Sequence, residues 1–132
     1  MGEIVKKFVV HCPLSFLVET LKSSNAIYKE RFRENFTEED LRTSYGRIVE
    51  PQSEEWIDDS PDVKKFISRT RFSSGFIDLT ITFKRLESDL TEVTYKLSFE
   101  YAIRLCLISE VIGFAKQLAS IEAAYNLSKT MI

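Results

Sequence analysis

The sequence predicts an α+β domain in which an antiparallel sheet packs against one long C-terminal helix. Polar and apolar residues alternate along two neighbouring stretches, 76–83 and 92–101, which is the period of a strand with one buried face. From residue 105 to residue 131 the apolar residues recur every three or four positions, which is the period of a helix. A helix with so long an apolar face needs a large partner, and the predicted sheet offers one.

The length and composition fit a single folded domain over residues 1–132. Of these 132 residues, 44% are hydrophobic and 29% are charged, so the chain can bury a core without disulfide bonds. The net charge is -2, and the lysines and arginines are scattered rather than gathered in a run. This distribution argues against a nucleic-acid-binding protein, because such proteins carry a basic stripe.

Neither a membrane span nor a secretion signal is expected. The most apolar window, residues 102–121, contains Arg104, Glu110 and Lys116, and charges at those depths would be costly in lipid. The first seven residues hold two lysines but no long apolar stretch. The sequence therefore predicts a cytoplasmic protein.

The first quarter of the chain predicts a strand followed by two short helices. Residues 4–11 are rich in β-branched side chains and predict a strand that Pro13 ends. An apolar face over residues 14–22 predicts a helix that starts after this proline. Residues 23–25 break that helix, and residues 26–32 predict a second short one.

The middle of the chain is less regular. Residues 33–41 fit a loop, a capped helix start or a strand equally well. Residues 44–50 predict a strand with a bend at Gly46. The polar stretch 51–61 predicts a loop with at most a short strand at residues 55–57.

The remaining strands complete an antiparallel sheet. Residues 64–72 predict a strand of mixed character, and the turn at 73–75 leads into the hairpin formed by the two alternating stretches. Residues 87–89 are turn-forming types and close that hairpin. In this layout the first and last strands pair antiparallel, so we expect Cys12 to lie near Thr91.

Two segments and the order of the elements resemble a known superfamily. Residues 8–21 (F-V-V-H-C-P-L-S-F-L-V-E-T-L) and residues 91–101 (T-E-V-T-Y-K-L-S-F-E-Y) look like the first strand entering a proline-started helix and the last strand of the START-like superfamily. This superfamily has the helix-grip fold of the birch-pollen allergen and of polyketide cyclases. Few Gln and Asn residues and abundant Ile, Glu and Lys also suit a thermophile, so the chain looks like a small archaeal branch.

The resemblance implies a curved sheet wrapped around the long helix, with a cavity between them. In relatives this cavity holds lipids, sterols, polyketides or acyl chains. The implied function is non-enzymatic binding of an apolar or amphipathic small molecule, without a cofactor. The residues expected to line the cavity are apolar or aromatic and come from the last two strands and from the helix: Ile77, Leu79, Ile81, Phe83, Tyr95, Leu97, Phe99, Tyr101, Phe114, Leu118, Ile121 and Tyr125.

No catalytic residue set stands out. His11 is the only histidine, and its place at a strand end favours an ordinary structural or solvated role over catalysis. The nucleophile motif G-x-S-x-G, the glycine-rich phosphate loop and the H-E-x-x-H helix are absent. Cys12 and Cys106 form no C-x-x-C pair and have no histidines at ligand spacing, so we expect free thiols and no metal site.

Several side chains fit two interpretations. Glu122 either turns outward to solvent or forms a polar handle inside the cavity. Arg69 and Arg71 are either solvated on the outer face of the sheet or aimed at a ligand carboxylate. Trp56 either gates a pocket or caps the core. Three tyrosines either find core hydrogen-bond partners or orient a ligand: Tyr45, Tyr95 and Tyr101.

Two other functions compete with simple ligand binding. A cyclase or dehydratase acting in the same cavity would require a paired acid and base. A protein-interaction module would use the second apolar flank of the long helix, which contains Ile108, Ile112 and Ala119, as a homodimer or partner surface.

Overall fold

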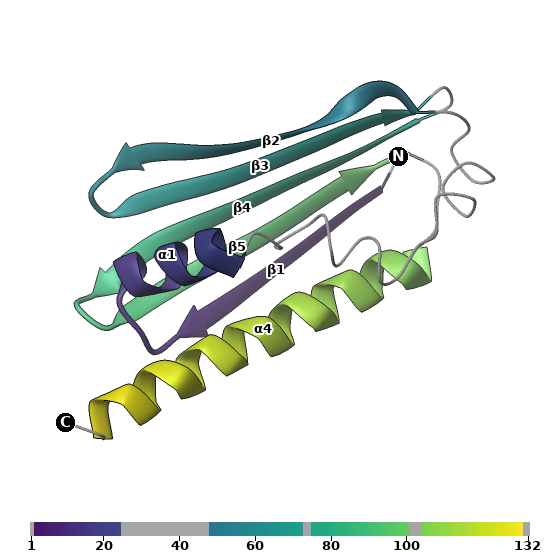
Figure 1. Cartoon of the computed structure of the whole chain (residues 1–132). Helices are drawn as coiled ribbons and strands as arrows, with labels where there is room; N and C mark the ends of the chain where they lie inside the picture. The colour runs from purple at the N-terminus through teal and green to yellow at the C-terminus, as the bar shows by residue number, and fades with distance from the viewer. Residues whose placement is uncertain (1, 25–47, 73–74, 101–103, 131–132) are drawn as a thin grey trace.

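The computed structural model describes residues 2–24, 48–72, 75–100 and 104–130 (Figure 1). These ranges form a five-stranded antiparallel sheet and two helices, so the predicted α+β class is confirmed. The strands are β1 (Gly2–Val10), β2 (Ile48–Ser60), β3 (Val63–Phe72), β4 (Gly75–Glu87) and β5 (Leu90–Phe99), and the helices are α1 (Leu14–Ser24) and α4 (Arg104–Thr130). The strand order is β1-β5-β4-β3-β2.

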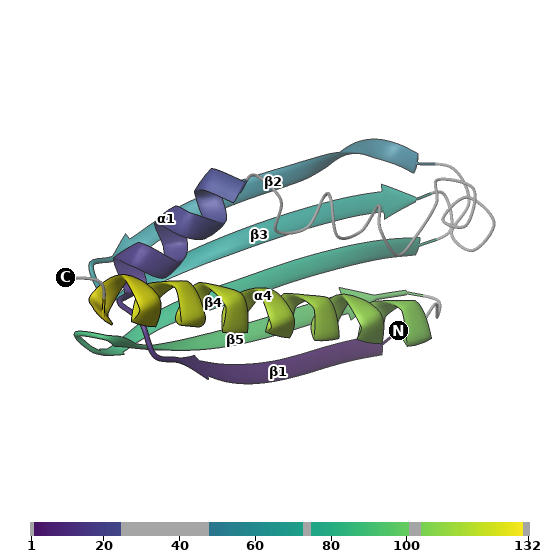
Figure 2. The same cartoon turned by 60° about the horizontal axis from the view of Figure 1, so that its bottom comes forward.

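Both helices cover the same face of the sheet (Figure 2). On that inner face β4 and β5 present alternate side chains that are at most 5% exposed: Ile77, Leu79, Ile81, Phe83, Val93, Tyr95, Leu97 and Phe99. The side chains between them point to the outer face and are partly or fully exposed. The alternation of polar and apolar residues that predicted this hairpin therefore arises because only one face of the sheet is buried.

The predicted pairing of the first and last strands is confirmed. β1 pairs antiparallel with β5, and Val10 lies opposite Thr91. The Thr91 hydroxyl donates a hydrogen bond of 2.9 Å to the carbonyl oxygen of Cys12. Of the two short helices expected after this strand, α1 is present, while residues 26–32 lie outside the described ranges.

The expected loop over residues 51–61 is wrong. Most of this stretch belongs to β2, a strand of 13 residues that pairs with β3 and contains several register shifts. β2 is an edge strand, so only one of its sides is hydrogen-bonded and polar residues remain in contact with water. Its composition therefore lacks the alternation that reveals the central strands, and an edge strand also tolerates Pro51.

Both edges of the sheet carry charge. Lys6 and Lys7 of β1 are exposed, as are Glu54, Glu55 and Asp59 of β2. Like charges on an edge strand hinder pairing of that edge with the same edge of another molecule.

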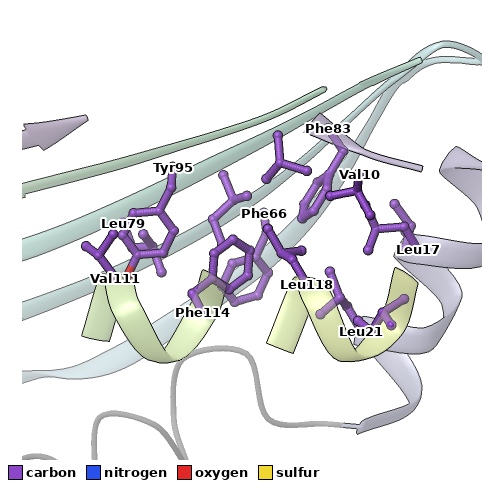
Figure 3. Packing of buried hydrophobic residues seen from close by; sticks show 14 of the residues in the cluster. Val10, Leu17, Leu21, Phe66, Leu79, Phe83, Tyr95, Val111, Phe114 and Leu118 are labelled. Atoms are coloured by element: carbon purple, nitrogen blue, oxygen red, sulfur yellow. The ribbon is translucent and has the colours of Figure 1, made fainter. Parts of the chain in front are cut away.

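The long helix supplies the other wall of the core. Figure 3 shows Val111, Phe114 and Leu118 of α4 pointing toward the sheet. These residues are at most 7% exposed, and the Phe114 ring lies 5.0 Å from the ring of Tyr95. On the opposite flank Ile112 is 51% exposed. Neither described helix combines the length and the apolar character that a membrane span requires.

Candidate functional site

A pocket of about 500 Å³ lies between α1 and the strands beside it, and we call it the α1 pocket. The helix side is lined by Pro13, Leu14, Ser15, Val18, Glu19 and Lys22. The sheet side is lined by Trp56, Ile57, Asp58, Pro61, Lys64, Arg85 and Ser88. Segments that are far apart in the sequence therefore meet at this site.

The helical period divides the α1 wall into an apolar base and a polar rim. Leu14 and Val18 are one turn apart, and both are at most 5% exposed because they also belong to the core. Ser15, Glu19 and Lys22 follow at spacings of four and three, so they lie along one line of the helix surface and stay exposed. The pocket is thus apolar near the core and polar near water.

Trp56 joins the pocket to the core. Its ring centroid lies 5.1 Å from that of Phe66 and 5.7 Å from that of Phe83, with the planes of Trp56 and Phe83 only 24° apart. Both phenylalanines are buried, whereas the indole is partly exposed and lines the pocket. Trp56 therefore caps the core and also lines the pocket, while gating of the pocket stays a prediction.

The cations of the pocket have different partners. The Lys64 ammonium pairs with the Asp58 carboxylate and donates a hydrogen bond of 2.8 Å to the Ser60 carbonyl oxygen. The Arg85 guanidinium lies 3.6 Å from the Asp62 carboxylate. Lys22 differs, because its ammonium lies over the Trp56 ring, 5.3 Å from the centroid.

The lining of the pocket combines apolar and charged side chains. Its described residues include three cations and two carboxylates, those of Glu19 and Asp58, but no histidine or cysteine. No group of three potential metal ligands occurs among the residues that the structure describes. An apolar wall with a few charged groups at its rim can hold and orient a small amphipathic molecule.

The residues expected to line a cavity between sheet and helix lie together in the core. Ten of them are at most 6% exposed and belong to one packed cluster: Ile77, Leu79, Ile81, Phe83, Tyr95, Leu97, Phe99, Phe114, Leu118 and Ile121. Tyr125 is partly buried, with its ring 5.2 Å from that of Phe16. Tyr101 lies outside the described residues. None of the twelve is among the residues that line the α1 pocket.

Polar residues are also buried on the inner face. Ser68 and Thr70 of β3 are at most 5% exposed, and Glu110 of α4 is 1% exposed. Ser68 and Glu110 both have interaction partners, so they are satisfied groups. Burial of this kind is common when a polar group keeps its partner, and it does not define a site.

Glu122 is half-buried and bonded to the backbone, and the two arginines lie on the outer face of the sheet. The Glu122 carboxylate accepts a hydrogen bond of 2.8 Å from the backbone N–H of His11, and thus links α4 to the end of β1. Arg71 pairs with Asp78, and Arg69 is exposed. Arg69, Arg71 and Asp78 alternate with the inward residues of their strands, so they belong to the outer face of the sheet. Tyr45 lies outside the described ranges.

Cys12 is a buried free thiol. Burial, and to a lesser extent the negative charge of Glu122, together raise the pKa of this thiol from 9.0 to about 11. Cys106 lies sixteen residues before Glu122 in α4, which is about 24 Å along the helix axis at about 1.5 Å per residue. Cys12 lies near Glu122, because the neighbouring His11 donates its backbone N–H to the Glu122 carboxylate. The backbone of residue 106 is therefore far beyond the roughly 7 Å between Cα atoms that a disulfide requires.

Sequence reasoning missed most of the α1 pocket. Trp56 was identified as a candidate pocket residue, but Lys22, Lys64 and Arg85 were not. The line of polar residues on α1 was the only local signal, and it equally fits an ordinary solvated helix face. The sheet side of the pocket forms only where α1 contacts strands that are distant in the sequence, and no local sequence pattern predicts that contact.

Comparison with known proteins gives structural neighbours without an assigned function. No protein-family model matches the chain, and no curated protein matches it either. A conserved protein from Geobacillus kaustophilus is similar with 12% identity and a TM-score of 0.37, over 94% of this chain and 91% of that one. A putative uncharacterized protein from Bacillus thuringiensis has the same identity and TM-score, over 94% of this chain and 98% of that one.

Proposed function

We propose that this chain is a non-enzymatic binding protein for a small amphipathic molecule and that the α1 pocket holds this molecule. One observation carries the proposal: a pocket of about 500 Å³ joins the Trp56 ring to three cationic side chains. This volume lies within the usual range for small-molecule sites, about 300–1,000 Å³. The ring and Val18 offer an apolar surface, and the charged rim offers groups that orient a polar end.

The resemblance to START-like proteins fits this function, because relatives in that superfamily bind lipids and acyl chains. Their binding place, between the sheet and the long helix, is the alternative location for the ligand in this chain. There the expected lining residues already pack against one another, so a ligand would have to displace side chains. The α1 pocket offers room without such rearrangement, and we therefore place the ligand there.

Native mass spectrometry of the purified protein tests whether a small molecule binds. We expect added mass that is lost on denaturation. The site is tested with a dansyl-labelled fatty acid and with Ser15→Trp, which places a large side chain on the exposed rim of the pocket. Ser23→Trp is the matched control, because Ser23 is also exposed on α1 but does not line the pocket.

The expected result is loss of probe binding in Ser15→Trp and unchanged binding in Ser23→Trp, with both proteins folded by circular dichroism. Equal binding by the two variants would move the site away from the α1 pocket. If neither native mass spectrometry nor the probe detects binding to the wild-type protein, the proposed function is wrong.

A further inference from the structure

We infer that the α1 pocket selects an anionic amphipathic ligand, a carboxylate or phosphate joined to an apolar body, and that Lys22 binds the anion. This inference rests on the proposed function and adds the chemical class of the ligand. It follows from the difference between Lys22 and the other two cations of the pocket.

Lys64 and Arg85 are already engaged by carboxylates. Lys64 pairs with Asp58, and Arg85 faces Asp62. An anionic ligand would have to compete with a neighbouring carboxylate for either of them. Their role is therefore to hold the strand ends that form one wall and to offset the negative charge of the acids around the pocket.

Lys22 has no carboxylate partner within the part of the chain that the structure describes. Glu19 lies one turn earlier on the same helix, yet the two side chains form no ion pair, and the Lys22 ammonium instead lies over the Trp56 ring. A cation over an aromatic face keeps its full charge, because the ring supplies only a quadrupole. Lys22 is thus the cation of the pocket that can accept an anion without breaking an existing ion pair.

The position of Lys22 also determines where the rest of the ligand goes. The ammonium lies where the apolar wall, formed by Trp56 and Val18, meets the exposed rim of α1. An anion bound there places an attached chain or ring against the indole and along the helix. A cationic ligand would instead be repelled by the Lys22 ammonium at this place.

The test compares ligands with the same apolar body and different ends: decanoate, decyl phosphate, decanol and decyltrimethylammonium. Trp56 is the only tryptophan of the chain, so its fluorescence reports occupancy of the pocket directly. We expect the two anions to bind about tenfold or more tightly than decanol, because a charge-assisted contact is lost with the alcohol. The relative affinity of carboxylate and phosphate identifies the type of anion.

Substitution of Lys22 assigns the effect to one residue. Lys22→Met keeps the length of the side chain and should lower the affinity for both anions about tenfold while leaving that for decanol unchanged. Lys22→Arg should retain anion binding. Lys116→Met is the control, because Lys116 is exposed on α4 and away from the pocket lining. Circular dichroism verifies that each variant folds.

The outcomes separate the inference from the function on which it rests. Anion preference that disappears in Lys22→Met supports the inference. Equal affinity for anions and decanol, or an equal loss for every ligand in Lys22→Met, overturns the inference and leaves the binding function intact. Absence of binding by all four compounds, together with no mass added in native mass spectrometry, overturns both.

Discussion

Trp56 stabilises the core and the pocket at the same time. Its indole stacks on Phe83 and contacts Phe66, which are both buried, and its exposed part lines the α1 pocket. The packing of the core thus fixes the position of one side chain that lines the α1 pocket. Changes of its size should therefore affect folding and binding together.

We expect Trp56→Ala to lower the free energy of unfolding by roughly 2–3 kcal/mol, somewhat less than for a fully buried tryptophan, because the indole is partly exposed. Trp56→Phe should recover most of this loss by keeping an aromatic ring on Phe83. Urea denaturation followed by circular dichroism measures both. A Trp56→Ala protein as stable as the wild type would contradict the stacking on the core.

The Cys12 thiol should make stability fall at alkaline pH. Its pKa is raised to about 11 in the folded protein, above the ordinary value of 9.0, so the folded state favours the neutral thiol. The resulting stability is fully present below pH 9.0 and is lost as the pH rises from there to about 11. At about 1.4 kcal/mol per pKa unit, the loss is at most roughly 3 kcal/mol.

Comparison with Cys12→Ala isolates this effect, because every other ionisable group is the same in both proteins. The difference in unfolding free energy between wild type and variant should shrink as the pH rises through this window. A difference that stays constant from neutral to alkaline pH would show that the thiol is not buried as described.

At the scale of elements, the strands with a regular apolar pattern were predictable, and the polar edge strand β2 was not. β4 and β5 alternate because the inner face meets the helices and the outer face meets water. β2 has water at one edge, so polar residues are acceptable at positions that would be apolar in a central strand. The pocket was only partly predictable for a different reason. Trp56 stood out as a large residue in a polar stretch, but the other lining residues come from α1 and from other strands, and their contact depends on the whole fold.

The packing of α4 predicts the effect of enlarging Leu118. This side chain is 3% exposed and belongs to the core cluster. We expect Leu118→Trp to overpack the space between helix and sheet and to destabilise the protein by roughly 1–3 kcal/mol. Ala119→Trp on the exposed side of the same helix should be nearly neutral.

Thermal melts of both variants measure the difference, and binding of the dansyl-labelled fatty acid is recorded in parallel. If Leu118→Trp melts near the wild-type temperature and loses probe binding, the ligand lies between the sheet and α4, not in the α1 pocket. Destabilisation with retained binding agrees with a close-packed core and a separate pocket.

At the scale of the whole molecule, the two ends of the sheet are unlike in charge. β1 exposes Lys6 and Lys7, and its Glu3 pairs with Lys96 of β5. β2 exposes Glu54, Glu55 and Asp59, of which Asp59 pairs with Lys65 of β3. Two copies that approach through the same edge repel each other, but β1 of one copy and β2 of another attract. A contact between two different surfaces leaves a free surface at each end, so it does not close into a dimer.

The charge that prevents like edges from pairing therefore favours open chains of molecules when the ionic strength is low, since salt screens such attractions beyond roughly 10 Å at about 0.1 M. We expect light scattering to increase as salt is removed and to return to its starting value when salt is restored. Replacing Lys6 and Lys7 by glutamate should abolish the increase, while the same change at Lys116 should not. In such a chain of molecules each contact joins β1 of one copy to β2 of the next, so the chain extends across the strands of the sheet.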